Sequence, residues 1–197
     1  MIQGTYHPIV YIIAKTLEIY FLSIDMEKAN FQILRHISSA MVNNCSTYED
    51  FIGCYSDLEY IKNSKYTRQV VFGKLNPKRQ MTCEKFFINE IRKLIDNTIS
   101  SNGGEIVSMS NDELVYKISE PKRFTNDTVL NLAETIKTVT DFTVHTDVFK
   151  LNGYEFQLMD SGKSKFTFFE KEFADGRKKL KSVPIPFYKM ICELPLN

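Results

Sequence analysis

The sequence predicts an α+β fold, in which an antiparallel sheet carries helices packed on one face and ends in a C-terminal β-hairpin extension. Several stretches are rich in β-branched and aromatic residues, which is typical of strands, whereas in three other segments the apolar residues recur at helical spacing. The elements follow the order strand, helix, irregular basic segment, helix, hairpin, helix, strand. An antiparallel sheet with its helices on one side fits this order.

The first two elements are a strand and a helix. Residues 9–24 are rich in β-branched and aromatic side chains, and their second half indicates a strand that ends at Asp25. From Lys28 to Val42 the apolar positions recur at helical spacing, so a helix follows the strand. Residues 43–60 are less regular, and we expect their aromatic side chains to pack on the core.

The second half of the chain begins with a helix that Thr82 can cap and whose apolar stripe runs from Phe86 to Ile99. A glycine-rich turn then leads into a hairpin with its tip at residues 111–113. The remaining elements are hairpin strands at 105–109 and 114–118, a helix at 127–139, a strand at 142–151, and later strand-like runs separated by turns at 160–162 and 175–176.

Composition restricts the class of protein. With 197 residues, 43% of them hydrophobic, the chain can bury one sizeable core. No run of eighteen apolar residues exists and the first residues do not resemble a signal peptide, so we expect no membrane association and a cytoplasmic or other intracellular location. The four cysteines lack C-x-x-C spacing, which favours free thiols over disulfides or a zinc site.

Two acidic strings are the strongest functional signal. Asp25 and Asp112 each lie at or beside the end of an apolar stretch, where a buried and unpartnered carboxylate costs several kcal/mol. In the predicted sheet the end of the first strand can lie beside the hairpin tip, so we expect the two carboxylates to converge. A shared cation would then compensate their charges. Alternatively, Asp25 caps a strand end and Asp112 stabilises a turn.

Basic residues are concentrated in one segment between the two acidic strings. Residues 62–83 contain six basic residues and no acidic one, which favours a nucleic-acid contact over a purely solubilising role. A second basic cluster lies near the C-terminal end, at residues 177–181. Such a cluster is ordinarily a solvated turn, although it could contact phosphates or an acidic partner.

Three short segments resemble the palm of family A DNA polymerases. Residues 25–38 resemble that family's first carboxylate motif, D-Y-S-Q-I-E-L-R-x-L-A-H-x-S, without a gap. Residues 107–118 resemble the second motif, x-x-Q-V-H-D-E-L-V-F-E-V, and residues 76–82 resemble the N-A-P-x-Q-G-T stretch that opens the preceding helix. In element order the resemblance covers roughly residues 15–151.

The resemblance implies a DNA-directed DNA polymerase that adds deoxynucleoside triphosphates (dNTPs) to a primer on a DNA template. It implies that Asp25 and Asp112 bind two Mg²⁺ or Mn²⁺ ions, with the Met26 carbonyl as a further ligand and Glu113 near the primer terminus. From the motifs and the basic segment, the expected DNA- or nucleotide-binding residues are Asn30, Lys65, Arg68, Asn76, Lys78, Arg79, Gln80 and Asn111.

The chain also departs from that family. Asn30 stands in place of a glutamate, Gln32 in place of an arginine, and Asn111 in place of a histidine. The segment between the two motifs is short, which implies reduced fingers around residues 43–75. Within it, residues 68–73 resemble the R/K-x3-F-G of the fingers' nucleotide-binding helix, so Lys65 or Arg68 would hold the triphosphate, with an ordinary basic connector as the alternative.

These features predict a palm-like domain at residues 1–152 and a β-rich extension at 153–197. Since no segment resembles a thumb or an exonuclease, we expect partner subunits to complete a divided polymerase. A free-standing minimal polymerase and a non-catalytic palm used for assembly or nucleic-acid binding are the alternatives. The frequent Lys, Asn and Ile residues hint at a viral source, which would place the protein in the host-cell cytoplasm.

Overall fold

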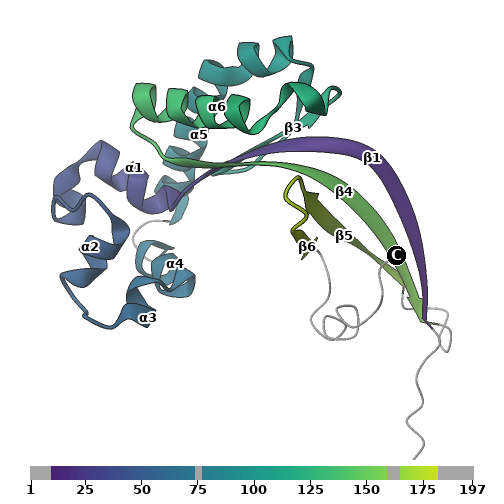
Figure 1. Ribbon diagram of the computed structural model, residues 1–197. Coiled ribbons are helices and arrows are strands. Elements are labelled where there is room, and N and C mark those ends of the chain that lie inside the picture. The colour runs from purple at the N-terminus through teal and green to yellow at the C-terminus, as the bar shows by residue number, and fades with distance from the viewer. Residues whose placement is uncertain (1–9, 74–76, 159–164, 182–197) are drawn as a thin grey trace, which may run out of the picture. The chain divides into compact units, whose positions relative to one another are not determined.

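The computed structural model describes residues 10–73, 77–158 and 165–181 (Figure 1). It confirms the predicted α+β class, because helices accompany a six-stranded antiparallel sheet with the strand order β2-β3-β1-β4-β5-β6. The strands are β1 (Val10–Met26), β2 (Gly104–Met109), β3 (Glu113–Ile118), β4 (Val144–Leu158), β5 (Lys165–Phe173) and β6 (Lys178–Lys181).

The chain forms two compact units. One comprises residues 22–147, and the other combines residues 1–21 with residues 148–197. This division differs from the boundary expected after residue 152, because the continuous strands β1 and β4 each belong to both units. Because this boundary lies inside unbroken strands, no change in composition marks it in the sequence.

Within the unit of residues 22–147, two long helices cover one face of the strands (Figure 1). Helix α5 (Pro77–Ser101) buries an isoleucine stripe, and α6 (Asn126–Thr140) begins at Thr125, whose hydroxyl accepts a hydrogen bond from the Thr128 amide. The buried side chains of α5 and β3 that form this core are Ile88, Ile91, Ile95, Ile99, Leu114, Tyr116 and Ile118. The prediction of helices on one face of the sheet is therefore confirmed.

The start of α5 corrects one prediction. Thr82 does not cap the helix, because it lies inside α5 and its hydroxyl donates to the Lys78 carbonyl at 2.9 Å. The helix instead begins at Pro77, and proline is favourable at a first helical position because it has no backbone N–H to satisfy there.

Four short α-helices and a 3-10 turn lie between β1 and α5. The expected helix from Lys28 to Val42 is shorter, because α1 (Ala29–Ile37) gives way to the 3-10 turn η1 (Ser39–Val42). The segment expected to be irregular contains α2 (Tyr48–Gly53) and α3 (Glu59–Lys62), and α4 (Lys65–Gly73) follows. Their shared core consists of Phe31, Val42, Tyr48, Ile52 and Phe72. Helices of one or two turns are too short to show a periodic pattern.

His36 of α1 is exposed. Its ring nevertheless lies against two aromatic side chains, with ring centroids 5.0 Å from Phe87 and 4.9 Å from Phe142. The imidazole therefore contacts aromatic rings although the residue is exposed.

The second unit contains the C-terminal strands. Strand β4 pairs with β5, and β5 pairs with β6 through the predicted turn at residues 175–176, where Gly176 adopts a φ of 82°. The turn expected at 160–162 lies outside the described residues. Among the described residues, no helix has the length and apolar character needed to cross a membrane.

Candidate functional site

The two acidic strings meet in the structure. Strands β1 and β3 are neighbours in the sheet, and the Met26 amide donates a hydrogen bond of 2.8 Å to the Asp112 carbonyl. The Ser23 hydroxyl donates to the Glu113 carboxylate at 2.6 Å. The end of β1 and the hairpin tip therefore lie side by side, as the sequence predicts.

Strand alternation places these polar side chains on the face of the sheet opposite the long helices. Leu22, Ile24 and Met26 of β1 are buried, so Ser23 and Asp25 point to the other face. In β3, Tyr116 points toward α5, where its hydroxyl donates to Asp96 at 2.8 Å. Glu113 lies three residues before Tyr116 in the same strand, so its side chain points to the opposite face of the sheet. This is the face that carries Ser23 and Asp25.

Asp25 is the electrostatic centre of the site. Asp25 is exposed as a residue, but neighbouring atoms partly shield its carboxylate from water. This partial burial and then the charges of Asp112 and Glu113 raise its pKa from 3.8 to about 6, while His145 and Lys65 act in the opposite direction. Three carboxylates therefore share one electrostatic environment, which is the arrangement that a cation would stabilise.

The hairpin tip is held by Ser110. Its hydroxyl accepts hydrogen bonds from the amides of Asp112 (3.4 Å) and Glu113 (3.0 Å) and donates one to the Asp112 carboxylate at 3.1 Å. Asn111 is half-buried at the tip. Ser110 therefore stabilises the backbone of the turn, and its hydrogen bond to the Asp112 carboxylate gives that side chain a part in the turn as well.

A fourth carboxylate, Glu84 of α5, was not among the residues that the sequence suggested. It is buried, and burial raises its pKa, as does the charge of Asp112. Glu84 follows Gln80 by one helical turn, so the motif at residues 76–82 could have pointed to it.

Of the two basic residues considered for the triphosphate, the structure brings Lys65 toward the site. The charge of Lys65 lowers the pKa of Asp25, so the two side chains lie within electrostatic reach of each other. Arg68, also on α4, instead lies over the Tyr48 ring, with its guanidinium carbon 5.6 Å from the ring centroid.

The other predicted residues are more scattered. Asn30 is half-exposed on α1, Lys78 and Arg79 are exposed in the first turn of α5, and Gln80 follows them, half-buried. Asn76 lies outside the described residues.

Gln32 has a structural role that its sequence context did not reveal. Its side chain is buried and makes two hydrogen bonds to the backbone of Thr143, accepting from the amide at 2.7 Å and donating to the carbonyl at 2.8 Å. It also donates to the Glu27 carbonyl. Gln32 therefore fixes the loop after β1 against the segment that enters β4, and this positions the strand end that carries Asp25.

Asp25 should make stability depend on pH. Because its pKa is raised to about 6 in the folded protein, the folded state binds more protons than the unfolded state between about pH 4 and pH 6. The stabilisation from the protonated form is present at low pH and is lost as pH rises through 6. We expect Asp25→Asn to flatten this dependence and to raise the melting temperature at pH 7, as measured by thermal melts from pH 4.5 to 7.5. An unchanged pH dependence in the variant would contradict the crowding of this carboxylate.

The donor chemistry of the site suits a hard cation. Asp25, Asp112 and the Met26 carbonyl supply only oxygen ligands, which Mg²⁺ and Mn²⁺ prefer. Burial first, and then the charges of Asp112 and Glu113, raise the pKa of Asp25, and a bound cation would relieve the repulsion among these carboxylates. In the part of the chain that the structure describes, no group of three or more His, Cys, Asp or Glu side chains forms a metal-binding cluster.

In comparisons with known proteins, the sequence matches no protein-family model and no curated protein.

Proposed function

We propose that this chain is the palm of a DNA-directed DNA polymerase, which partner subunits complete. The observation that carries the proposal is the meeting of the two acidic strings: the Met26 amide donates to the Asp112 carbonyl, and the charge of Asp112 helps to raise the pKa of Asp25. Paired carboxylates at adjacent strand ends are what two-metal nucleotidyl transfer requires. The substrates would be dNTPs and primer-template DNA.

Each residue has a role in this proposal. Asp25, Asp112 and the Met26 carbonyl would hold the two metal ions. When bound, these ions lower the pKa of the primer 3′-hydroxyl and neutralise the triphosphate. Lys65 would bind a triphosphate oxygen, since its charge already reaches Asp25. Glu113, oriented by Ser23, would lie near the primer terminus.

The basic start of α5 would contact DNA. Lys78 and Arg79 are exposed in its first turn, where cations can neutralise backbone phosphates. Gln80 follows on the same helix and would contact the minor groove.

A non-catalytic palm that serves assembly or nucleic-acid binding is the second candidate. Two neutral side chains favour it, because Asn30 and Asn111 stand where the polymerase resemblance implies charged or ionisable residues. This candidate keeps the fold and the basic segment but needs no metal.

Thermal melts with divalent ions separate the two candidates. For a catalytic palm, saturating Mn²⁺ or Mg²⁺ should raise the melting temperature, since an ion at a hundred times its dissociation constant adds about 2.7 kcal/mol. For a chain of this size that corresponds to a shift of roughly 5–10 °C. The Asp25→Asn/Asp112→Asn double variant should lose the shift. An equal shift in both proteins, or none in the wild type, would favour the non-catalytic palm.

A further inference from the structure

The three C-terminal strands sort their charges by face. In β5, Phe169, Lys171 and Phe173 lie on one face, whereas Glu170 and Glu172 lie on the other. Strand pairing extends the first face on both sides, because Phe149 lies opposite Phe173, Lys179 opposite Lys171, and Lys181 opposite Phe169. We call this surface the basic-aromatic face; it consists of Phe149, Phe169, Lys171, Phe173, Lys179 and Lys181.

The acidic residues of β5 are engaged on the opposite face. Glu170 is only 3% exposed; its carboxylate accepts from Asn152 and from Tyr154, each at 3.3 Å, and pairs with Lys178 at 3.2 Å. Glu172 accepts from Asn152 at 3.0 Å. These contacts commit both glutamates to the other side of the sheet, so they do not lie among the lysines of the basic-aromatic face.

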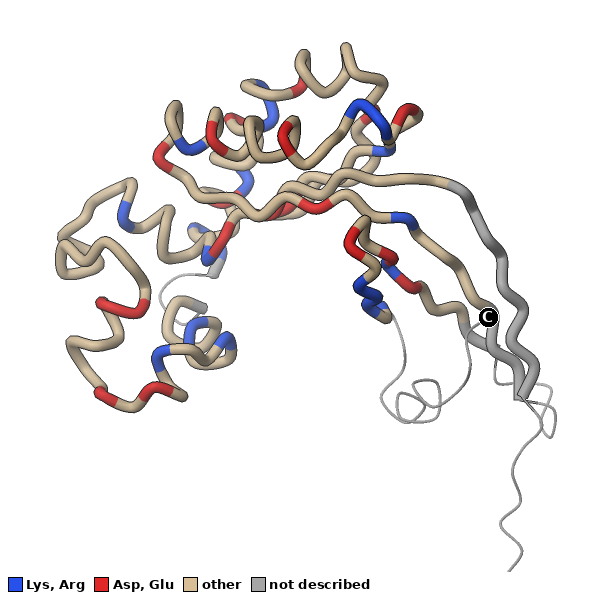
Figure 2. Tube along the Cα trace, viewed as in Figure 1, with Lys and Arg blue, Asp and Glu red and all other residues tan. Residues whose placement is uncertain are grey.

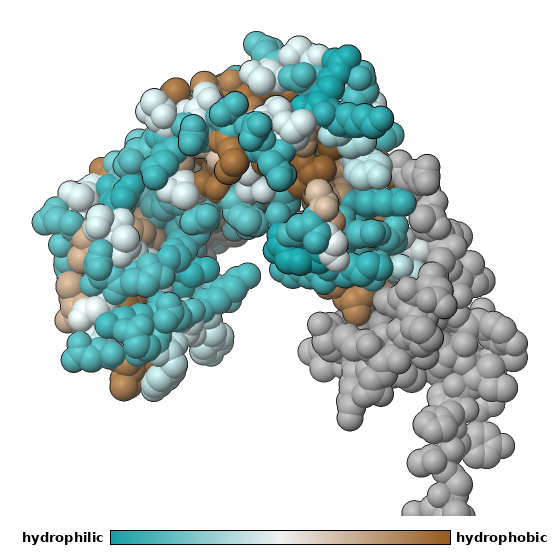
Figure 3. All heavy atoms as spheres, viewed as in Figure 1, coloured by the Kyte–Doolittle hydropathy of each residue, from teal (hydrophilic) through white to brown (hydrophobic). Residues whose placement is uncertain are grey.

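On the basic-aromatic face, cations lie against aromatic rings. The Lys171 ammonium lies 4.0 Å from the centroid of the Phe149 ring, and Phe149 lies 6.1 Å from Phe173, centroid to centroid. Arg177, which pairs with Asp175, lies 5.0 Å from the Phe173 ring. Strand β6, at the edge of the sheet, is almost entirely basic (Figure 2). The described surface seen in Figure 3 is mostly hydrophilic.

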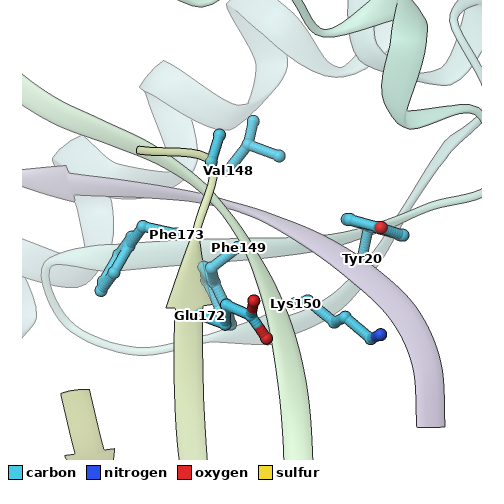
Figure 4. Close-up of a pocket in the computed structure, with 7 residues that line it drawn as sticks. Tyr20, Val148, Phe149, Lys150, Glu172 and Phe173 are labelled. Atoms are coloured by element: carbon cyan, nitrogen blue, oxygen red, sulfur yellow. The ribbon is translucent and has the colours of Figure 1, made fainter. Parts of the chain in front are cut away.

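A hollow of about 220 Å³ adjoins this face (Figure 4). Its lining combines Phe149 and Phe173 of the basic-aromatic face with Tyr20 of β1 and with one cation and one anion, Lys150 and Glu172. The hollow therefore provides further aromatic surface, with one positive and one negative side chain at its wall.

We propose that the basic-aromatic face binds single-stranded nucleic acid, with its lysines on backbone phosphates and Phe169 and Phe173 stacked on bases. Half-exposed rings interleaved with cations are typical of proteins that bind single strands, because every unpaired base offers a π-face and every nucleotide a phosphate. A duplex offers the phosphates but hides the faces of its bases. This proposal does not depend on catalysis at Asp25.

Lysines on an edge strand also prevent unwanted strand pairing. That protective role requires neither half-buried phenylalanines on the same face nor the segregation of the glutamates to the other face. The arrangement of the whole face therefore favours binding of a polyanion with exposed bases.

Fluorescence anisotropy with the full chain and a labelled 20-nucleotide oligo(dT) tests the proposal. Lys179→Gln/Lys181→Gln should lower the affinity about tenfold and reduce the slope of log K against log salt by about 1.4, the loss of two phosphate contacts. Phe169→Leu, which keeps an apolar side chain, should lower the affinity about fivefold or more through lost stacking. The matched control Lys122→Gln/Lys137→Gln removes two exposed lysines elsewhere and should bind as the wild type does.

Two further readouts make the result decisive. Circular dichroism melts confirm that each variant folds, and a labelled 20-base-pair duplex should bind more weakly than the single strand. Equal oligo(dT) affinity in the wild type and the Lys179→Gln/Lys181→Gln variant would overturn the proposal, as would tighter binding of the duplex. None of these variants alters Asp25 or Asp112, so failure here leaves the polymerase proposal to its own test.

Discussion

Replacing Asp25 or Asp112 by asparagine is expected to abolish Mg²⁺-dependent primer extension. Asparagine keeps the size of the side chain and one oxygen, but it removes the negative charge that would hold the proposed metal ions. We expect each change to lower the rate at least about a thousandfold, equivalent to ~4 kcal/mol of transition-state stabilisation. The measurement is extension of a labelled primer on a DNA template with all four dNTPs, by the chain alone and with the partner subunits that the proposal requires.

The matched control is Asp57→Asn. Asp57 is exposed in the loop between α2 and α3, so this variant makes the same chemical change away from the site and should extend primers at the wild-type rate. Circular dichroism should show that all three variants fold. Primer extension that persists unchanged in both site variants would exclude the proposed role of the carboxylate pair.

Much of the sheet could be predicted from the sequence because its signals are local. The hairpin at residues 104–118 has a glycine-rich turn before it and alternating side chains within it, and both of its strands lie within one residue of their predicted bounds. The segment from 43 to 73 could not be predicted in the same way. Its short helices are stabilised by a shared aromatic core, and such tertiary contacts leave no periodic pattern in the sequence.

In the candidate site, too, local features could be predicted from the sequence and long-range contacts could not. The neighbourhood of Asp25 and Asp112 followed from placing each at a strand end, which is local information. Glu84 and Gln32 were missed as parts of the site because their roles depend on distant partners: Glu84 on the charge of Asp112, and Gln32 on the backbone of Thr143. Hydrogen bonds across more than a hundred residues become visible only once the fold is known.

Truncation of Phe72 is expected to destabilise the helical cluster more than any surface change. Phe72 is 1% exposed and is the fully buried side chain of α4 among the described residues. Its ring centroid lies 6.5 Å from that of Phe31 and 6.0 Å from those of Tyr48 and Phe51. Phe72→Ala would leave a cavity among these rings and should lower the free energy of unfolding by about 3–5 kcal/mol, measured by urea denaturation followed by circular dichroism.

The same helix supplies the control. Tyr66 is 76% exposed on α4, so Tyr66→Ala removes an aromatic ring of similar size without creating a cavity and should change stability by no more than about 0.5 kcal/mol. Phe72 anchors the helix that carries Lys65. Phe72→Leu keeps an apolar side chain at this position, so it should preserve most of the stability and also the dNTP affinity. Lys65→Ala should lower dNTP affinity with little effect on stability. Equal losses of stability from Phe72→Ala and Tyr66→Ala would show that α4 is not anchored through this ring.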